Sequence, residues 1–228
     1  MKEQEYRQIE EYVLEQMNDS AHDKMHLYRV LYAALEIAEA EQGADEDVLV
    51  AACLLHDIGR EAQAKDARLD HAAVGAKMAF DFLCEAGWSV EKAAYVRDCV
   101  AAHRFRRKAQ NGSAEAKILF DADKLDAVGA VGLARTLLYM GETRIPLYIL
   151  NPGGEIELEG ESRERNTFFQ EYHYKMDSVY GCFFTAKAKE MSETRRAAAV
   201  SFYESLLDEV GEPHKKGPAR LRRLLEEK

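Results

Sequence analysis

The first 145 residues contain no proline, and this absence constrains the fold more than any other feature of the sequence. The four prolines all come later, at positions 146, 152, 213 and 218. Proline interrupts helices and is frequent in the turns of loop-rich β proteins, so its absence favours helices. Hydrophobic residues make up 47% and charged residues 32% of the 228 residues, a balance typical of a folded chain with a sizeable core.

Apolar residues at helical spacing extend this prediction along the chain. Asp45 and Ser89 are predicted N-caps, and Gly43 and Gly87 are predicted helix ends. We therefore predict an all-α fold. Its helices are expected over about 3–17, 21–42, 46–56, 69–86, 90–103, 113–126, 128–140, 166–180 and 186–210.

The remaining segments lack that spacing. Residues 60–68 are polar and predict a loop or frayed turn. Residues 141–165 contain two prolines and Gly153-Gly154, which predicts an irregular excursion or a lid. Residues 211–228 predict a charged tail that frays. Since no linker composition precedes residue 141, we expect one domain over 1–228, with its core over about 20–140.

The net charge of −10, from 41 acidic and 31 basic residues, argues against a duplex nucleic acid as partner. It leaves room for a small anion in a local basic site. The four cysteines are widely spaced and predict reduced thiols. The polar N-terminus and the short longest apolar run, Val48–Leu55, predict a cytoplasmic protein with no membrane partner.

One motif points to chemistry: Leu54-Leu55-His56-Asp57-Ile58-Gly59 ends an apolar helix with an adjacent His-Asp pair. A buried imidazole beside a buried carboxylate is costly unless something pairs with both, and a divalent metal ion does so. Neighbouring helical residues point about 100° apart, but they can converge where a helix ends. His26 on the preceding helix and Asp123 in an acidic segment are the candidate ligands from elsewhere in the chain.

The order His26, His56-Asp57, Asp123 resembles the HD-domain metal-dependent phosphohydrolases, and Ala122-Asp123-Lys124-Leu125 is similar to the setting of their distal aspartate. Residues 121–135, 166–172 and 185–190 resemble a subgroup of small bacterial HD proteins, some of which are nucleotide pyrophosphohydrolases. The resemblance covers roughly residues 20–210. It implies a single HD-domain helical bundle with additional C-terminal helices, and a metal ion on His26, His56, Asp57 and Asp123.

This ligand set suits Mn, Fe, Ni, Co or Zn, and less typically Mg. Such an ion polarises a phosphoryl oxygen and activates water. The resemblance thus implies hydrolysis of a phosphate ester or anhydride, with a nucleotide as leading substrate. Asp57 and Glu61 are the candidate catalytic residues. The candidate substrate-binding residues, for each of which an ordinary surface or structural role is the alternative, are Arg29, Arg60, Lys65, His103, Arg104 and Lys124.

Several alternatives remain open. His71 and His103 match the positions of extra ligands in HD proteins that bind two metals, and a dinuclear site favours a cyclic-nucleotide or dinucleotide phosphodiesterase. A catalytically silent regulatory module that binds nucleotides is a third interpretation. A closed structural zinc site is disfavoured, because structural zinc favours thiolates and these four ligands include none. The apolar C-terminal helices offer an interface for a homodimer.

Overall fold

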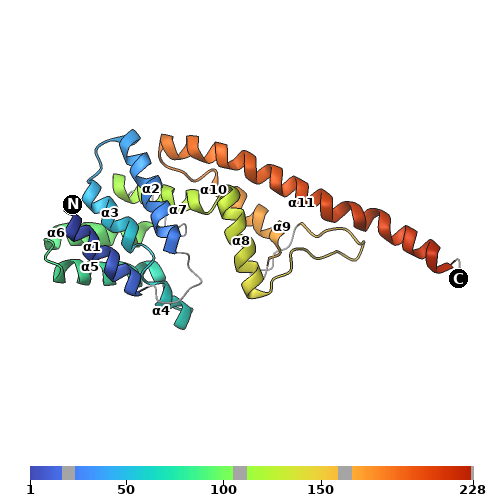
Figure 1. The fold of residues 1–228 in the computed structure, drawn as a ribbon, viewed down its shortest axis with the longest axis horizontal. Helices are drawn as coiled ribbons and strands as arrows, with labels where there is room; N and C mark the ends of the chain where they lie inside the picture. Colours follow the sequence, from blue (N-terminus) through green and yellow to red (C-terminus); the bar gives the residue numbers. More distant parts are fainter. Residues whose placement is uncertain (17–23, 105–111, 159–165, 227–228) are drawn as a thin grey trace. The chain divides into compact units, whose positions relative to one another are not determined.

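The computed structural model describes residues 1–16, 24–104, 112–158 and 166–226. Within these ranges the regular structure is helical, apart from an isolated antiparallel bridge between Leu150 and Ile156 (Figure 1). The predicted all-α fold class is therefore confirmed. The elements are α1 (Glu3–Gln16), α2 (Lys24–Glu41), α3 (Glu46–Leu55), α4 (Arg60–Lys65), α5 (His71–Glu85), α6 (Val90–Ala102), α7 (Ala114–Asp126), α8 (Gly129–Thr143), α9 (Phe168–Glu171), the π-helix η2 (Tyr172–Met176), α10 (Asp177–Val179) and α11 (Ala186–Glu226).

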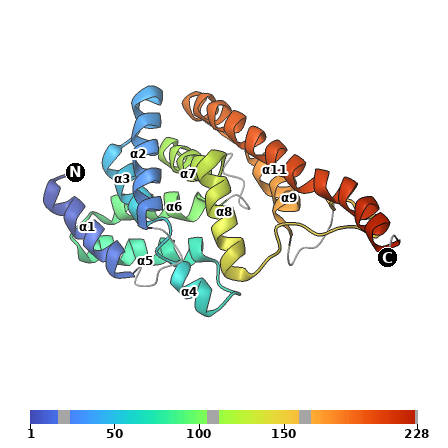
Figure 2. The same ribbon diagram turned by 45° about the vertical axis from the view of Figure 1, so that its right-hand side comes forward.

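The contacts divide the chain into two compact units, of which the first comprises Met1–Asp126 and Phe183–Glu190. In this unit α2 packs against α3 and α7, and α5 packs against α6, as Figures 1 and 2 show from two sides. At its centre, every residue from Ala51 to Gly59 is buried. The chain therefore carries the His56-Asp57 pair into the core of the first unit.

Local sequence signals set the ends of these helices. Asp45 Oδ1 caps α3 by accepting hydrogen bonds from the backbone N–H groups of Asp47 and Val48 at 3.0 and 3.1 Å. Ser89 Oγ caps α6 through the N–H of Lys92 at 3.2 Å. Gly43 and Gly87 have φ values of +84° and +88°, a conformation in which an L side chain is strained. These predicted caps and helix ends are confirmed.

The segment over 60–68 differs from its prediction, because Arg60–Lys65 forms the helix α4. The turn after α3 starts it, since Arg60 N–H donates to the carbonyl of Asp57 at 3.0 Å and Gln63 N–H to that of Gly59 at 3.2 Å. No residue of α4 is buried. A short helix of this kind has no apolar stripe, which is the signal that the sequence prediction relied on.

The first unit also includes the start of α11, which is held by a carboxylate of α7. Asp121 accepts hydrogen bonds from Phe184 N–H at 3.0 Å, and from the N–H and Oγ1–H of Thr185 at 2.8 and 2.7 Å. Asp121 is fully buried. Its side chain therefore fixes the 183–190 segment to the helix that carries Asp123.

The second unit comprises Ala127–Cys182 and Met191–Lys228. After α8, residues 144–158 form the expected irregular excursion, and residues 159–165 lie outside the described ranges. The predicted helix over 166–180 is instead divided into α9, η2 and α10, and α11 continues to Glu226 where a frayed tail was expected. The buried core of this unit consists of Leu133, Met140, Phe168, Phe169, Tyr172, Met176, Ala199 and Tyr203. The prediction of one domain over 1–228 stays a prediction.

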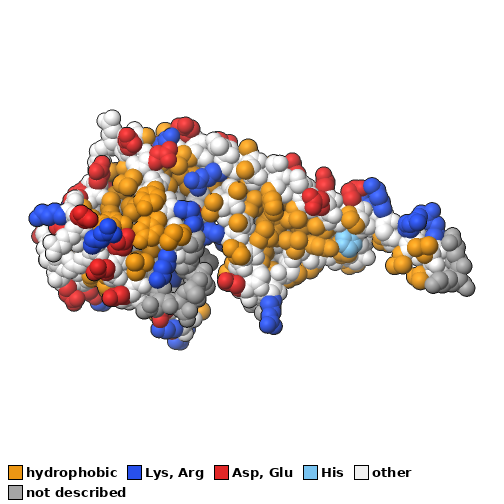
Figure 3. All heavy atoms as spheres, viewed as in Figure 1, with side chains coloured by type: hydrophobic (Ala, Val, Ile, Leu, Met, Phe, Trp, Pro, Cys, Tyr) orange, Lys and Arg blue, Asp and Glu red, His pale blue; other side chains and the backbone are white. Residues whose placement is uncertain are grey.

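No helix within the described ranges combines the length and apolar character that crossing a membrane requires. On the face drawn in Figure 3, acidic and basic side chains are interspersed around hydrophobic areas. The described part of this face therefore shows no broad basic surface of the kind that duplex DNA-binding proteins present.

Candidate metal centre

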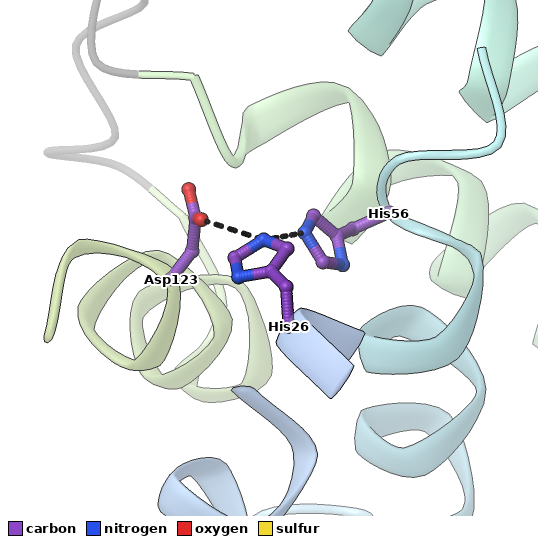
Figure 4. Close-up of side chains that lie close together, drawn as sticks. All are labelled: His26, His56 and Asp123. Carbon is purple, nitrogen blue, oxygen red and sulfur yellow. Dashed lines mark hydrogen bonds and ion pairs between the residues drawn. The ribbon is translucent and has the colours of Figure 1, made fainter. Parts of the chain in front are cut away.

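Four elements of the first unit bring the predicted ligand residues together. His26 lies in the first turn of α2, His56 is the C-cap of α3, Asp57 lies in the turn that follows, and Asp123 is on α7. All four side chains are buried. Figure 4 shows His26, His56 and Asp123 pointing toward one another from their three elements.

The ligand atoms converge on a small volume. His26 Nε2 lies 3.3 Å from His56 Nε2 and 3.5 Å from Asp123 Oδ1. Asp57 Oδ2 lies 3.8 Å from His26 Nε2 and 3.6 Å from His56 Nε2. Ligand atoms around an octahedral ion with bonds of about 2.1 Å are about 3 Å apart. The spacing therefore suits a divalent ion with small adjustments of the side chains.

The hydrogen bonds at Nδ1 determine which nitrogen of each histidine carries the proton. In every case Nδ1 donates a hydrogen bond to an oxygen, so the proton is on Nδ1 and the lone pair is on Nε2. Four buried imidazoles therefore direct Nε2 lone pairs toward the same region. The pairs are His26 with Asp126 Oδ2 at 2.7 Å, His56 with Cys53 O at 2.7 Å, His71 with Gln63 Oε1 at 2.7 Å and His103 with Val100 O at 2.6 Å.

A second group lies on the other side of Asp57. Asp57 Oδ1 is 3.7 Å from His71 Nε2 and 3.6 Å from His103 Nε2, and Arg60 Nε is 2.9 Å away. His71 Nε2 and His103 Nε2 are buried without a hydrogen-bond partner, and Asp57 Oδ1 has Arg60 Nε as its ion-pair partner. Because all three are acceptors, the group fits a cation or a hydrogen-bond donor better than the phosphate oxygens that we expected His103 to bind.

Glycine at position 59 allows this second group to form. A Cβ there would lie 2.1 Å from the carbonyl oxygen of His71 and 2.7 Å from the backbone nitrogen of Gly75. Any larger residue would push α5 away from the turn that carries Asp57. The glycine thus lets His71 approach Asp57.

The electrostatics favour the neutral forms of His56 and His71 and the charged forms of Asp57 and Asp123. Burial lowers the pKa of His56 to about 4, and burial together with Arg60 lowers the pKa of His71 to about 3. Burial alone would raise the pKa of Asp57, but the Arg60 guanidinium beside it outweighs burial and holds this pKa well below its usual range. The Lys124 ammonium group does the same for the pKa of Asp123. Neutral imidazoles and ionised carboxylates are the forms that bind metal ions.

Three of the predicted substrate-binding residues contact acids of the site. Arg60 forms an ion pair with Asp57, and Lys124 Nζ lies 2.5 Å from Asp123 Oδ2. Arg29 Nε donates to Asp126 Oδ1 at 2.6 Å. Each of these cations therefore stabilises a buried carboxylate.

The other predicted residues pair with groups outside the four proposed ligands. Glu61 and Lys65 pair with each other on the exposed side of α4 at 2.5 Å. Arg104 Nη1 lies 3.0 Å from Asp70 Oδ1, and Asp70 caps α5 directly before His71. Three further basic residues follow Arg104 in the sequence, at positions 106–108, and they lie outside the described residues. The roles of these residues in catalysis and substrate binding stay predictions.

The sequence did not single out Asp126 or Gln63, although each accepts a hydrogen bond from the Nδ1 of a histidine of the site. Asp126 offered one signal: it follows Asp123 by three residues, so both face the same side of α7. Gln63 offered none, because its helix was predicted as a loop.

The donor set meets the requirements of a divalent ion. Nitrogen and carboxylate ligands together suit Mn, Fe, Co, Ni and Zn. The buried acceptors His71 Nε2 and His103 Nε2, which have no hydrogen-bond partner, also call for a positive charge or a donor. Two separate groups can each hold an ion: His26, His56 and Asp123, and Asp57, His71 and His103.

A helical bundle with a His, His-Asp, Asp centre is typical of one class of metal-binding hydrolases. Comparison with known proteins identifies that class. Residues 24–128 match the family model of the HD domain. The structure of a predicted HD-superfamily hydrolase from an uncultured Thermotogales bacterium is 31% identical, with a TM-score of 0.61 over 90% of this chain and 92% of that one. The chain therefore belongs to the HD superfamily, as its resemblance predicted.

Bacillus subtilis YpgQ is a further relative. The uncharacterized protein YpgQ of strain 168 is 28% identical over 196 residues, which cover 84% of this chain and 85% of YpgQ. The crystal structure of YpgQ in complex with ADP matches with 26% identity and a TM-score of 0.69, over 90% of this chain and 97% of that one.

Proposed function

We propose that this protein is a metal-dependent phosphohydrolase that cleaves a phosphate ester or anhydride of a nucleotide. The observation that carries the proposal is the convergence of His26, His56 and Asp123 with Asp57 Oδ2 in a buried, pre-organised centre. Membership of the HD hydrolase superfamily supports the reaction class. The ADP complex of YpgQ supports a nucleotide as ligand.

A divalent ion at this centre would polarise a phosphoryl oxygen and lower the pKa of a water molecule. The residues of the chain prepare the centre for that chemistry. Asp57 stays ionised and presents Oδ2 to the ligand nitrogens, while Lys124 and Arg60 supply positive charge beside the carboxylates. Positive charge placed in advance stabilises the negative charge that develops on phosphoryl oxygens.

Hydrolysis forms a bond from a water oxygen to phosphorus, breaks the bond from phosphorus to the leaving oxygen and releases one water proton. Glu61, four residues after Asp57, is the proposed acceptor of that proton. Lys65 and Arg104 are the proposed substrate contacts.

A cyclic-nucleotide or dinucleotide phosphodiesterase is the second candidate. One observation favours it: the buried group of Asp57 Oδ1, His71 Nε2 and His103 Nε2, which can hold a second ion. Arg60 Nε, 2.9 Å from the same oxygen, opposes it, because a second ion would meet a positive charge already in place. We therefore propose one ion at His26, His56, Asp57 and Asp123.

The test is a panel of nucleotides and phosphodiesters, assayed with protein that has been stripped of metal and reloaded. We expect hydrolysis only after reloading, and its loss in Asp57→Ala. The matched control is Asp66→Ala, which removes an exposed carboxylate that pairs with Arg68 and should leave turnover unchanged. Turnover without metal, or full turnover in Asp57→Ala, would contradict the proposal. Nucleotide binding without turnover would favour the silent regulatory module.

A further inference from the structure

Asp126 is a buried carboxylate of α7 that lies beside the proposed ligands. Its side chain is 4% exposed. Oδ2 accepts the Nδ1 proton of His26 at 2.7 Å. Arg29 donates to the same carboxylate with two nitrogens, Nε to Oδ1 at 2.6 Å and Nη2 to Oδ2 at 3.1 Å. The three side chains form a continuous chain, Arg29–Asp126–His26.

We propose that Asp126 and Arg29 are positioning residues that determine which nitrogen of His26 binds the metal ion. The inference rests on the proposed metal-dependent function. It gives Arg29 a role different from the substrate contact that the sequence suggested.

The geometry around His26 supports this role. Its Nε2 points at His56 Nε2 and Asp123 Oδ1, so a proton on Nε2 would occupy the place of the ion. An ionised carboxylate at 2.7 Å from Nδ1 keeps the proton on that nitrogen and leaves Nε2 as a lone pair. Carboxylates that hold the far nitrogen of a metal-binding histidine also raise its basicity and fix the ring orientation.

Arg29 places a positive charge on the same carboxylate. An ionised carboxylate buried without a cation is costly, and a two-nitrogen contact from a guanidinium is the strongest available partner. Arg29 and His26 are three residues apart on α2, so one carboxylate of α7 reaches both. The arrangement also fixes the register between the two helices that carry His26 and Asp123.

Asp126→Asn is the informative substitution. Its amide oxygen should turn toward the donors of Arg29, which places the NH₂ group against His26 Nδ1. That nitrogen would then have to accept, and the proton would move to Nε2. We expect the dissociation constant for Mn²⁺ or Co²⁺ to rise by about 10–100-fold. Nitrogen NMR of the metal-free protein with labelled histidine should show His26 protonated at Nδ1 in wild type and at Nε2 in the variant.

The matched control is Asp121→Asn, which alters another buried carboxylate of α7 that binds the 183–190 segment. It should lower stability and leave metal affinity and the His26 tautomer unchanged. Arg29→Met is the second variant, and it should also weaken metal binding in the absence of nucleotide. Arg29→Lys should restore part of the affinity.

The outcomes separate this inference from the proposed function. Failure of the wild-type protein to bind any divalent ion would overturn the proposed function, while the NMR measurement would still decide the tautomer. Unchanged metal affinity and an Nδ1 proton in Asp126→Asn would overturn the inference alone. A rise in KM for nucleotide with unchanged metal affinity in Arg29→Met would overturn the role given to Arg29.

Discussion

Arg60 Nε lies 2.9 Å from Asp57 Oδ1, on the side of the carboxylate that faces His71 and His103. The other oxygen, Oδ2, faces His26 and His56. The two oxygens of Asp57 therefore serve two groups of histidines, and a guanidinium is placed at one of them. We expect this placement to limit the number of ions that the centre holds.

The first prediction concerns metal stoichiometry. With a positive charge at Oδ1, we expect the reloaded wild-type protein to hold one divalent ion per chain. Arg60→Met removes that charge and leaves His71, His103 and Asp57 Oδ1 available, so a second ion should bind. Elemental analysis of dialysed protein measures the ratio. Arg68→Met, which alters an exposed arginine, is the control and should remain at one ion. Two ions in wild type would favour the dinuclear phosphodiesterase.

The second prediction concerns Glu61. Removing a general base costs about 10²–10⁴-fold in rate, so Glu61→Gln should lower kcat by at least about 100-fold with metal content unchanged. Its exposed partner Lys65 provides Lys65→Met as a control for the loss of the surface pair. Steady-state kinetics with reloaded protein measure both. An unchanged kcat in Glu61→Gln would remove Glu61 from the mechanism.

The third prediction concerns stability and pH in metal-free protein. The pKa of His56 is lowered by burial to about 4 in the fold, against about 6.5 in the unfolded chain. A lowered histidine pKa means that protons bind the unfolded state more tightly, so the stability is complete above pH 6.5 and is lost as the pH falls toward 4. His71, with a pKa of about 3, acts in the same direction.

Urea unfolding at several pH values, with a chelator present, measures this loss. For His56 alone the free energy of unfolding should fall by about 2 kcal/mol between pH 7 and pH 5. His56→Gln should flatten that part of the profile. A free energy of unfolding that stays constant from pH 7 to pH 5 would contradict neutral, buried imidazoles.

The fourth prediction concerns Gly59. A methyl group there would overlap the backbone of His71 and Gly75, and backbone cannot move aside as a side chain can. We expect Gly59→Ala to lower the free energy of unfolding by about 1–3 kcal/mol. The control is Gly141→Ala in α8, where a Cβ meets no atom within 4 Å and should be neutral or slightly stabilising. Equal stabilities for the two variants would refute the close contact.

The candidate ligand residues, which the structure brings together, could be singled out from the sequence because their order is a one-dimensional signal: His26, then His56-Asp57, then Asp123. The residues that hold them could not, since Asp126, Gln63 and the carbonyls of Cys53 and Val100 become partners only when the helices pack. Helices with an apolar stripe or a cap were predicted correctly for the same reason. The exposed helix α4 and the π-helix η2 depend on turn geometry and packing, which leave little trace in hydrophobic spacing.

The measurement that tests the central claim most directly is phosphate release from nucleotides by one preparation, stripped of metal and then reloaded with Mn²⁺. We predict that turnover is absent before reloading and appears afterwards, with products resolved by phosphorus NMR. Turnover that is the same before and after reloading, or none on any nucleotide with the metal bound, would contradict the account.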